Sequence, residues 1–301
     1  MKQILFGLLI FLLLYLIWQY LELKKFSITH YAVSSEKVKK DYTVAVIADL
    51  HGFTYGKNNR RLIQAVSDVK PDLICIPGDM IVGQKEKSHR ASLRSLAQLR
   101  QIAPIYYSYG NHESRMHQST PKNRALFRDY EKQVEEMGIH ILNQKMAAWD
   151  DSLCISGLEI PISCYKKGKA VPLPEGFIRD NMPQVPKESF QILLAHNPYY
   201  AKDYAAWGAD LTLCGHYHGG LVRIPGVGSL ISPQFEWFPK YDAGQFTVDG
   251  RQIIVSRGMG THTFHIRIFN RAELVVVHVR GAESMPGRSR PGQDGKKRFT
   301  S

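Results

Sequence analysis

Side chains able to bind metal ions follow five predicted strands of this chain, and this arrangement limits the folds open to it. Each strand is a short apolar run, and the donors come directly after it. In open α/β sheets, ligands bind beyond the carboxyl ends of the strands, so we expect these donors to converge. In chain order, the strands and donors are residues 43–48 with Asp49-Leu50-His51, 72–77 with Gly78-Asp79, 104–108 with Gly110-Asn111-His112-Glu113, 191–195 with His196, and 210–214 with Gly215-His216-Tyr217-His218.

The donor types predict a site for divalent ions. Carboxylate, imidazole and carboxamide groups suit manganese, iron and zinc. No cysteine is among them, whereas structural zinc sites usually contain cysteine. Each motif alone has an ordinary explanation: Gly78-Asp79, for example, is typical of a turn closed by an Asx side chain. Five such motifs, each at a strand end, favour one shared metal centre.

The order of elements predicts a mixed α/β (α+β) layered domain. Strands and helices alternate up to about residue 150, with helices expected at 59–69, 93–99 and 127–137. Strands dominate afterwards, at 153–156, 191–195, 210–214, 245–248, 252–255 and 274–279. A chain of 301 residues is long enough to bury a substantial core.

The N-terminus predicts a membrane anchor. Residues 4–21 form an apolar run of eighteen residues interrupted by Gln19, and about twenty such residues span a bilayer. A cleaved signal peptide is the alternative, but no small-residue cleavage site follows. We expect an anchor at 1–25, a polar tether at 26–42, a catalytic domain at 43–280 and a disordered basic tail at 281–301. The sequence leaves open which side of the membrane the domain occupies.

Charge and cysteine content narrow the partners. A net charge of +12 suits nucleic acid, an anionic membrane or a phosphate-bearing substrate. No nucleic-acid-binding motif accompanies the charge, so nucleic acid is not favoured. No protein partner is predicted. The four cysteines lack paired spacing and read as buried apolar residues, with a Cys154–Cys164 disulfide left open.

The ordered motif set resembles the calcineurin-like metallophosphoesterases. The N-terminal anchor and the segments 256–260 and 267–271 resemble the bacterial membrane-anchored subgroup, which is similar to hydrolases of UDP-diacylglucosamine. The resemblance implies a four-layer α/β/β/α sandwich. It also implies a first metal held by Asp49, His51 and His218, a second held by Asn111, His196 and His216, and Asp79 bridging both.

The resemblance further implies hydrolysis of phosphodiester or pyrophosphate bonds, on a small molecule or a lipid- or nucleotide-linked substrate. Two cations clamp the attacking and leaving oxygens and acidify a water to hydroxide. His112 is expected to act beside the metals, as a general acid or by stabilising charge, and Glu113 to orient His112 or support the ligands from behind. Tyr217 and His262 are candidate substrate contacts. Tyr217 stands where the family usually has threonine.

Two other functions remain open on this fold. One is a non-catalytic membrane scaffold, and the other is a metal-dependent nuclease. A second open point is the aromatic cluster around Phe235, Trp237, Phe238 and Tyr241. It is either a local core or an apolar lip that meets the membrane or an acyl chain.

Overall fold

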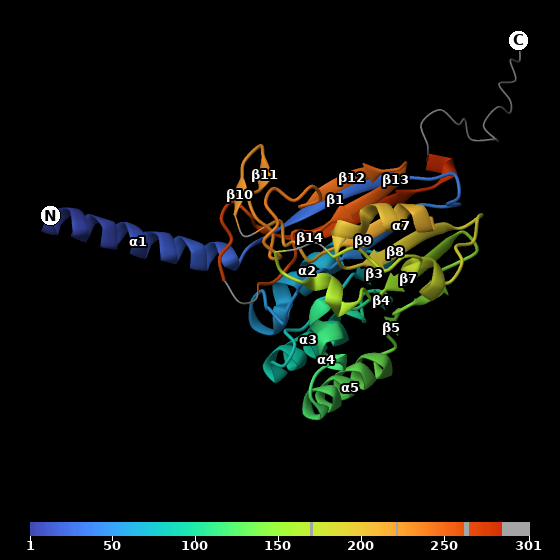
Figure 1. Cartoon of the computed structure of the whole chain (residues 1–301), viewed down its shortest axis with the longest axis horizontal. Helices are drawn as coiled ribbons and strands as arrows, with labels where there is room; N and C mark the ends of the chain where they lie inside the picture. The colour runs from blue at the N-terminus through green and yellow to red at the C-terminus, as the bar shows by residue number, and fades with distance from the viewer. Residues whose placement is uncertain (169–170, 221, 262–264, 285–301) are drawn as a thin grey trace, which may run out of the picture.

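The computed structural model contains two six-stranded sheets packed face to face (Figure 1). It describes residues 1–168, 171–220, 222–261 and 265–284. In spatial order, the first sheet contains β1 (Phe26–Ser34), β14 (Ala272–Arg280), β2 (Tyr42–Val46), β3 (Leu73–Ile76), β4 (Ile105–Tyr107) and β5 (His140–Ile141). Neighbouring strands are parallel except for β14 and β2, which are antiparallel.

The second sheet is parallel at its centre and antiparallel at its edges. In spatial order, its strands are β12 (Gly244–Val248), β13 (Arg251–Val255), β9 (Leu211–Cys214), β8 (Phe190–Ala195), β7 (Leu153–Leu158) and β6 (Lys145–Ala148). A small separate hairpin pairs β10 (Arg223–Ile224) with β11 (Gly228–Ser229).

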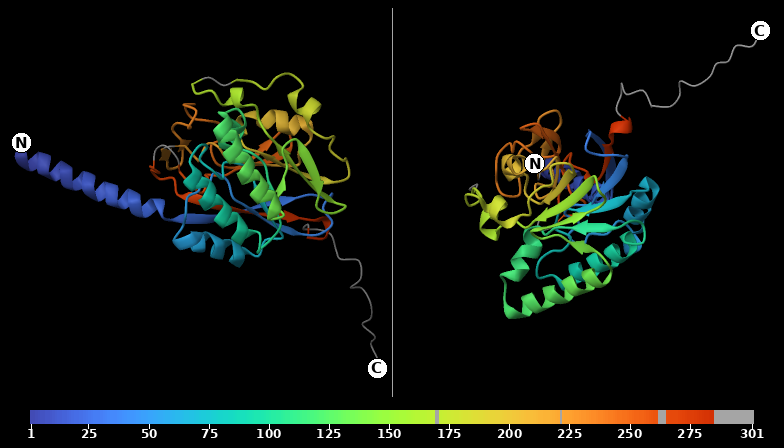
Figure 2. Two further views of the ribbon diagram at one scale, coloured as in Figure 1. Left: turned by 90° about the horizontal axis from the view of Figure 1, so that it is seen from below. Right: turned by 90° about the vertical axis from the view of Figure 1, so that its right-hand side faces the viewer.

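Helices cover the outer face of each sheet, which gives the four layers that the sequence predicted (Figures 1 and 2). Over the first sheet lie α2 (Arg60–Val69), α3 (Glu86–Leu99), α4 (Asn111–His117) and α5 (Pro121–Glu136). Over the second sheet lie α6 (Phe177–Asn181) and α7 (Ala201–Trp207). Short 3-10 turns occur at Lys57–Asn59, Ile162–Tyr165, Pro198–Tyr200 and Ala282–Ser284.

Three apolar clusters hold these layers together. The central cluster lies between the sheets and includes Val44, Val277, Ile155 and Leu213. The other two lie between each sheet and its helices. Strands β2 and β3 are buried on both faces, which explains why they read as continuous apolar runs rather than as alternating patterns.

The first strand of the domain was not expected. Residues 26–34, predicted as part of a polar tether, form β1, which pairs with β14 along nine residues. The tether is therefore wrong for this segment, and the folded domain begins at Phe26. An edge strand with one half-buried face needs few apolar residues, so its mixed polar sequence resembled a linker. Of the predicted tail, Ala282–Ser284 form a turn, and 285–301 lie outside the described residues.

Helix α1 (Lys2–Leu23) projects from the domain (Figure 1). Within the described residues it is the one helix long and apolar enough to cross a membrane. Its base is attached to the domain: Gln19 Nε2 donates to the carbonyl of Arg267 at 3.3 Å, and Arg267 N donates to Gln19 Oε1 at 3.2 Å. Glu22 also forms an ion pair with Arg271. The four cysteines are free and buried, so Cys154 and Cys164 form no disulfide.

Packing between the sheets predicts a large cost for truncating a central residue. Ile155→Ala removes a fully buried side chain from the cluster between the sheets, and it should lower the free energy of unfolding by about 2–5 kcal/mol. Ile28→Ala, at an exposed position on β1, is the control and should cost about 0.5 kcal/mol or less. Urea unfolding of the full chain in detergent measures both. Equal costs would contradict the packing described here.

Candidate metal centre

The carboxyl ends of strands from both sheets bring the predicted donors together. Asp49, Asp79 and Asn111 follow β2, β3 and β4 of the first sheet, and His196 and His216 follow β8 and β9 of the second. All seven predicted ligand residues are at most 8% exposed. Among the described residues, three groups of three donors form, each with its ligand atoms within 4.8 Å of one another. Two of them consist of predicted metal ligands, and the third joins His112 to His51 and Asp79.

The first group contains Asp49, His51 and His218. His51 Nε2 lies 3.2 Å from His218 Nε2, and His218 Nε2 lies 3.5 Å from Asp49 Oδ1. The other ring nitrogen of His51, Nδ1, is 3.1 Å from the carbonyl oxygen of Ile81. A hydrogen bond from Nδ1 to that carbonyl fixes the ring so that Nε2 faces the group, as in metal-binding histidines generally.

The second group contains Asp79, His196 and His216. Asp79 Oδ2 lies 3.2 Å from His196 Nε2 and 3.9 Å from His51 Nε2, so one carboxylate oxygen faces both groups. His196 Nδ1 is 3.0 Å from the carbonyl oxygen of Pro77, which orients its ring as Ile81 orients that of His51. The two groups therefore meet at Asp79.

Buried polar atoms at this point fit divalent cations. Among the described residues, Asn111 Oδ1 and His216 Nε2 are buried without a hydrogen-bond partner. Such atoms are costly unless something binds them. Their lone pairs, together with two buried carboxylates, make a donor set of the kind that manganese, iron or zinc accepts. The residues thus fit the metals that the donor chemistry suggests.

The backbone is strained at the same residues. Asp49, His51, Asp79, His216 and His218 have φ values between +51° and +70°. Side chains other than glycine, asparagine and aspartate seldom adopt this left-handed conformation. Each such residue costs of the order of 1–3 kcal/mol, and strain of this kind gathers at functional sites. The turns that aim these side chains inward are therefore maintained against a local preference.

The pKa values of the metal-free cluster reflect crowded charges. Burial raises the pKa of Asp49 to about 7. Burial also opposes ionisation of Asp79, but the neighbouring imidazoles of His196 and His112 outweigh it and hold its pKa well below the usual value. Burial disfavours the charged form of His196, yet Asp79 and Asp49 raise its pKa to about 9. Burial, reinforced by His196, lowers the pKa of His216. In the metal-free cluster, protons on Asp49 and His196 thus offset the negative charge that a bound cation would otherwise offset.

His112 and Glu113 have different surroundings. The His112 ring packs edge-on against His51, with 4.9 Å between centroids, and it shares a donor group with His51 and Asp79. Its backbone N–H donates to Asp79 Oδ1 at 2.9 Å. Glu113 lies behind the cluster, where it accepts hydrogen bonds from Tyr107 Oη and from the backbone N–H groups of residues 79, 80, 81 and 110. Glu113 therefore supports the Asp79 turn from behind, which is one of the two places expected for it.

The loop after β13 closes one side of the centre. Gly258 has φ +69°, and a side chain there would meet Asp49 Cβ at 2.9 Å and His218 Nδ1 at 3.1 Å. The buried guanidinium of Arg267 donates to the carbonyls of residues 257, 258, 260 and 270. Asn270 Nδ2 donates to the carbonyls of His218 and Gly220, both at 2.6 Å. Sequence reasoning noted this segment for its family pattern but did not identify its supporting role.

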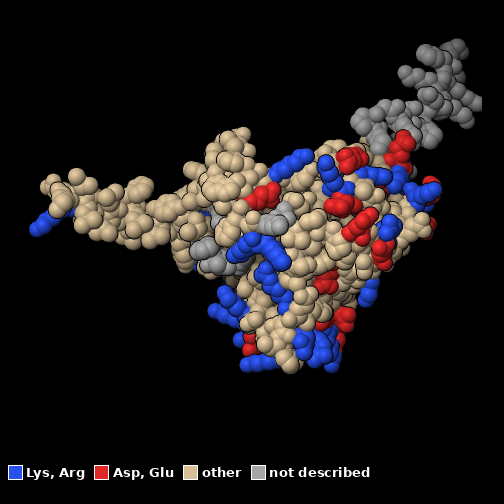
Figure 3. Space-filling view, viewed as in Figure 1, with Lys and Arg blue, Asp and Glu red and all other residues tan. Residues whose placement is uncertain are grey.

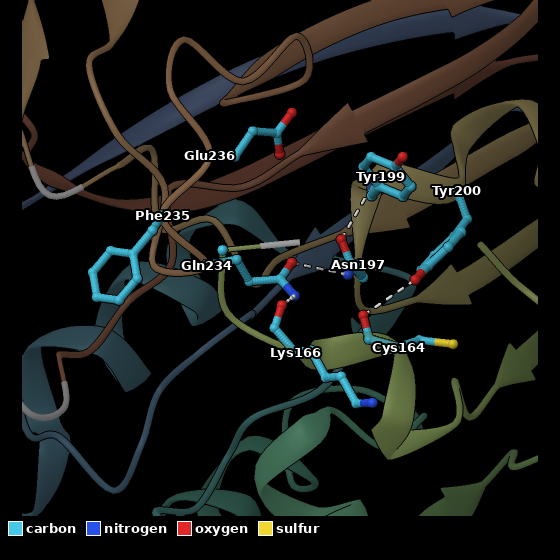
Figure 4. Close-up of a pocket in the computed structure, with 9 residues that line it drawn as sticks. Cys164, Lys166, Asn197, Tyr199, Tyr200, Gln234, Phe235 and Glu236 are labelled. Carbon is cyan, nitrogen blue, oxygen red and sulfur yellow. Dashed lines mark hydrogen bonds between the residues drawn. The ribbon is translucent and has the colours of Figure 1, made fainter. Parts of the chain in front are cut away.

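A pocket of about 300 Å³ is lined in part by Asn197, the residue that follows His196 (Figure 4). Tyr165 at its edge packs against His216, with ring centroids 4.9 Å apart. Asn197, next to His196, donates to Gln234 Oε1, and Gln234 Nε2 donates to the carbonyl of Lys166. Its lining residues are Cys164, Lys166, Gly168, Asn197, Tyr199, Tyr200, Gln234, Phe235 and Glu236. This pocket could not be predicted from the sequence, because its residues come from three separate segments of the chain.

The two residues predicted to contact substrate are Tyr217 and His262. Tyr217 is 2% exposed, and its hydroxyl donates to Glu236 at 2.7 Å. This hydrogen bond ties the metal loop to residue 236, and Tyr217 is not among the residues that line this pocket. Its role as a substrate contact stays a prediction. His262 lies outside the described residues.

Comparison with known proteins agrees with this geometry. Residues 42–220, more than half of the chain, match the model of the calcineurin-like phosphoesterase family. The chain belongs to this family. The matched range contains all seven donors of the cluster, together with His112 and Glu113.

Relatives of this metallophosphoesterase carry consistent names. The chain is 28% identical to the phosphodiesterase YaeI of Escherichia coli K12, over 70% of this chain and 71% of that protein. It is 24% identical to the uncharacterised metallophosphoesterase YkuE of Bacillus subtilis 168, over 86% and 87%. A zebrafish transmembrane protein with a metallophosphoesterase domain is 24% identical over 79% of this chain and 53% of its own.

Family membership and the donor clusters together define the general activity. The protein is a metal-dependent phosphoester hydrolase. Its fold is the mixed α/β sandwich of that family, with one N-terminal helix apolar enough to span a membrane.

Metal affinity should rise with pH. In the metal-free protein the pKa of His196 is about 9, so a proton occupies the ring at neutral pH and a metal must displace it. Affinity for manganese should therefore tighten by about tenfold per pH unit for each displaced proton, until pH passes that pKa. Calorimetric titration of the metal-stripped full chain at several pH values measures this. Affinity that is constant or falls with pH would contradict the protonation described.

The supporting role of Glu113 predicts a stability cost. In Glu113→Gln the amide NH2 group faces backbone N–H donors that the carboxylate now satisfies, so unfolding free energy should fall by about 1–3 kcal/mol. The matched control is Glu131→Gln, because Glu131 is partly exposed and accepts a hydrogen bond from Tyr109 Oη; it should cost less than about 1 kcal/mol. Urea unfolding measures the free energy of unfolding of both variants. If Glu113→Gln unfolds with the same free energy as the wild type, the hydrogen bonds of Glu113 do not stabilise the fold.

Proposed function

We propose that this protein is a membrane-anchored phosphoesterase with two divalent metal ions, which hydrolyses phosphodiester or pyrophosphate bonds of a lipid- or nucleotide-linked substrate. One observation carries the proposal: two groups of buried donors meet at a single carboxylate, that of Asp79. A shared carboxylate between two donor sets is the arrangement that a pair of cations about 3.5–4 Å apart requires.

Each ligand has an assigned place. Asp49, His51 and His218 would hold one ion; Asn111, His196 and His216 would hold the other; Asp79 would contact both. When bound, the pair of ions supplies Lewis acidity toward the phosphoryl oxygens and lowers the pKa of water enough to make a nucleophile near neutral pH. Because Asn111 is a neutral ligand, the site keeps more positive charge for an anionic substrate than a third carboxylate would leave.

His112 would act on the leaving group. Its ring stands against His51 and within reach of Asp79 without belonging to either ligand triad. A protonated imidazole there can donate a proton to the departing oxygen or stabilise charge on the phosphoryl group. The hydrogen bond from the backbone N–H of His112 to Asp79 Oδ1 holds residue 112 beside the cluster.

A diester or pyrophosphate suits the surroundings better than a monoester. A monoester carries an extra charged oxygen and needs a further cation beside the metals. Among the described residues, the buried guanidinium of Arg267 points to four carbonyls, and Lys166 lies in the adjacent pocket. The pocket lined by Lys166 would then receive the second group bonded to the phosphorus. In a pyrophosphate this group carries negative charge, which Lys166 would attract. The name of the Escherichia coli relative, a phosphodiesterase, agrees.

Loss of the shared carboxylate should abolish activity. Asp79→Ala should reduce manganese-dependent hydrolysis of bis-p-nitrophenyl phosphate by more than about a hundredfold, because each bound ion contributes several kcal/mol. His112→Ala should slow turnover by about 10²–10⁴ while the metal content stays unchanged. His140→Ala, at an exposed position, is the control and should match the wild type. Steady-state kinetics and elemental analysis measure these outcomes.

The competing functions make different predictions in the same assays. A scaffold would purify without bound transition ions and hydrolyse no phosphoester. A nuclease would cleave DNA and bind it with an affinity that falls steeply as salt rises. Activity on the diester that survives Asp79→Ala unchanged would contradict the two-metal site itself.

A further inference from the structure

We propose that an apolar rim beside the base of α1 rests on the bilayer surface and holds the metal centre at the lipid headgroups, so that the substrate is a phosphodiester amphiphile residing in the membrane. This rests on the proposed function and specifies its substrate class. The rim is defined by six residues with exposed fractions between 39% and 67%: Ile224, Val227, Trp237, Phe238, Ile266 and Phe269.

The rim is one continuous structural unit. Ile224, Val227 and Phe269 line the same surface hollow. Val222 bridges to Ile268, which ties the start of β10 to the segment that carries Ile266 and Phe269. Ile231 bridges to Trp237, and Phe238 N donates to the carbonyl of Leu230, which ties the aromatic pair to the same hairpin. Six large apolar side chains exposed on one connected unit indicate an interaction surface.

The anchor helix places this rim at the membrane. Gln19 exchanges two hydrogen bonds with the backbone of Arg267, directly next to Ile266. Trp18 and Tyr20 on α1 are exposed aromatic residues of the kind that sit at the membrane interface. The hairpin β10–β11 stands beside the base of α1 in Figure 1. The end of the span and the rim therefore lie at the same level.

The charged side chains of the hairpin and the aromatic pair have polar partners within the protein. Arg223 Nη1 forms an ion pair with Asp242 at 2.9 Å, and Glu236 accepts the hydroxyl of Tyr217. These are the two charged residues of segment 222–239. In Figure 3 the projecting hairpin is almost wholly tan, in contrast to the charged surface elsewhere in that view. Contact of this segment with lipid would therefore leave each of its two charged groups with a polar partner within the protein.

A basic belt flanks the rim and complements anionic headgroups. Arg61 Nη1 donates to the carbonyl of Lys24, which places the start of α2 against the base of α1. Exposed cations gather at this junction: Lys24, Lys25, Lys57, Arg60 and Arg61. Each such residue near an anionic surface contributes attraction that disappears with salt. Apolar rim and basic belt together favour a bilayer over a second protein as the occupant.

The rim is built on the loops that support the metals. Gly219 and Gly220 connect His218 to the hairpin, and Asn270, next to the rim residue Phe269, donates to the carbonyls of His218 and Gly220. A surface resting on lipid through these loops brings the donors close to the headgroup level. A substrate that approaches the donors from the bilayer would present the phosphodiester of a lipid headgroup. Water would cleave one P–O bond of this diester, leaving one product in the lipid and releasing the other.

Fluorescence in vesicles tests the docking directly. The full chain carrying Trp18→Phe is reconstituted into vesicles of phosphatidylcholine and phosphatidylglycerol that contain a brominated lipid, which quenches tryptophan at the interface. Quenching should occur and should disappear on further change of Trp237→Phe. The matched change Trp207→Phe, on α7 away from the base of α1 (Figures 1 and 2), should leave it intact. The proposal would be overturned if quenching persisted without Trp237. It would also be overturned if no quenching occurred and Trp237 instead caused copies of the protein to associate with one another.

Activity tests the substrate class. Trp237→Ser with Phe269→Ser should lower hydrolysis of a vesicle-borne p-nitrophenyl phosphodiester of diacylglycerol by about tenfold or more, and should leave soluble bis-p-nitrophenyl phosphate unaffected. Equal losses on both substrates, or no loss on either, would overturn the inference. A wild type inactive on the soluble diester would instead refute the proposed function, and the quenching result would still decide the docking.

Discussion

The constraint on which this structure depends is the burial of two carboxylates among four imidazoles at the junction of two sheets. Asp49 and Asp79 are at most 1% exposed, and ionised groups so buried are costly unless cations compensate for them. Asp79 takes the central place, since one of its oxygens faces donors from both sheets. The left-handed turns, the Glu113 network and the orienting carbonyls of Pro77 and Ile81 all serve to keep that arrangement in position.

The sandwich supplies this arrangement because its two sheets end at the same place. Strands β2, β3 and β4 lead into four of the donors from one sheet, and β8 and β9 lead into the other three from the second sheet. Residues of one loop then connect the centre to α1: Asn270 contacts the metal-binding loop, and the backbone of Arg267 bonds to Gln19. The position of α1 therefore bears on how a substrate would approach the donors.

Much of this could be predicted from the sequence, because strand ends fix where side chains meet. The layered fold, the N-terminal apolar helix and the set of converging residues follow from apolar runs and from what comes directly after them. Strand β1 was missed, since its pairing with β14 depends on a partner some 245 residues away and leaves only a weak apolar pattern. The inward burial of Tyr217 and the placement of Glu113 behind the turn depend on loop conformation, which spacing alone does not encode. Local composition singled out Trp237 and Phe238 as a candidate apolar lip, but it does not reveal that two further segments bring Ile224, Val227, Ile266 and Phe269 beside them.

The central claim is that one carboxylate serves two ions. The most direct test is a crystal structure of the manganese-loaded full chain, with anomalous scattering recorded to locate the metal. The account predicts two anomalous peaks about 3.5–4 Å apart, on either side of the Asp79 carboxylate, one contacted by His51 and His218 and the other by His196 and His216. A single peak, or peaks away from Asp79, would contradict it.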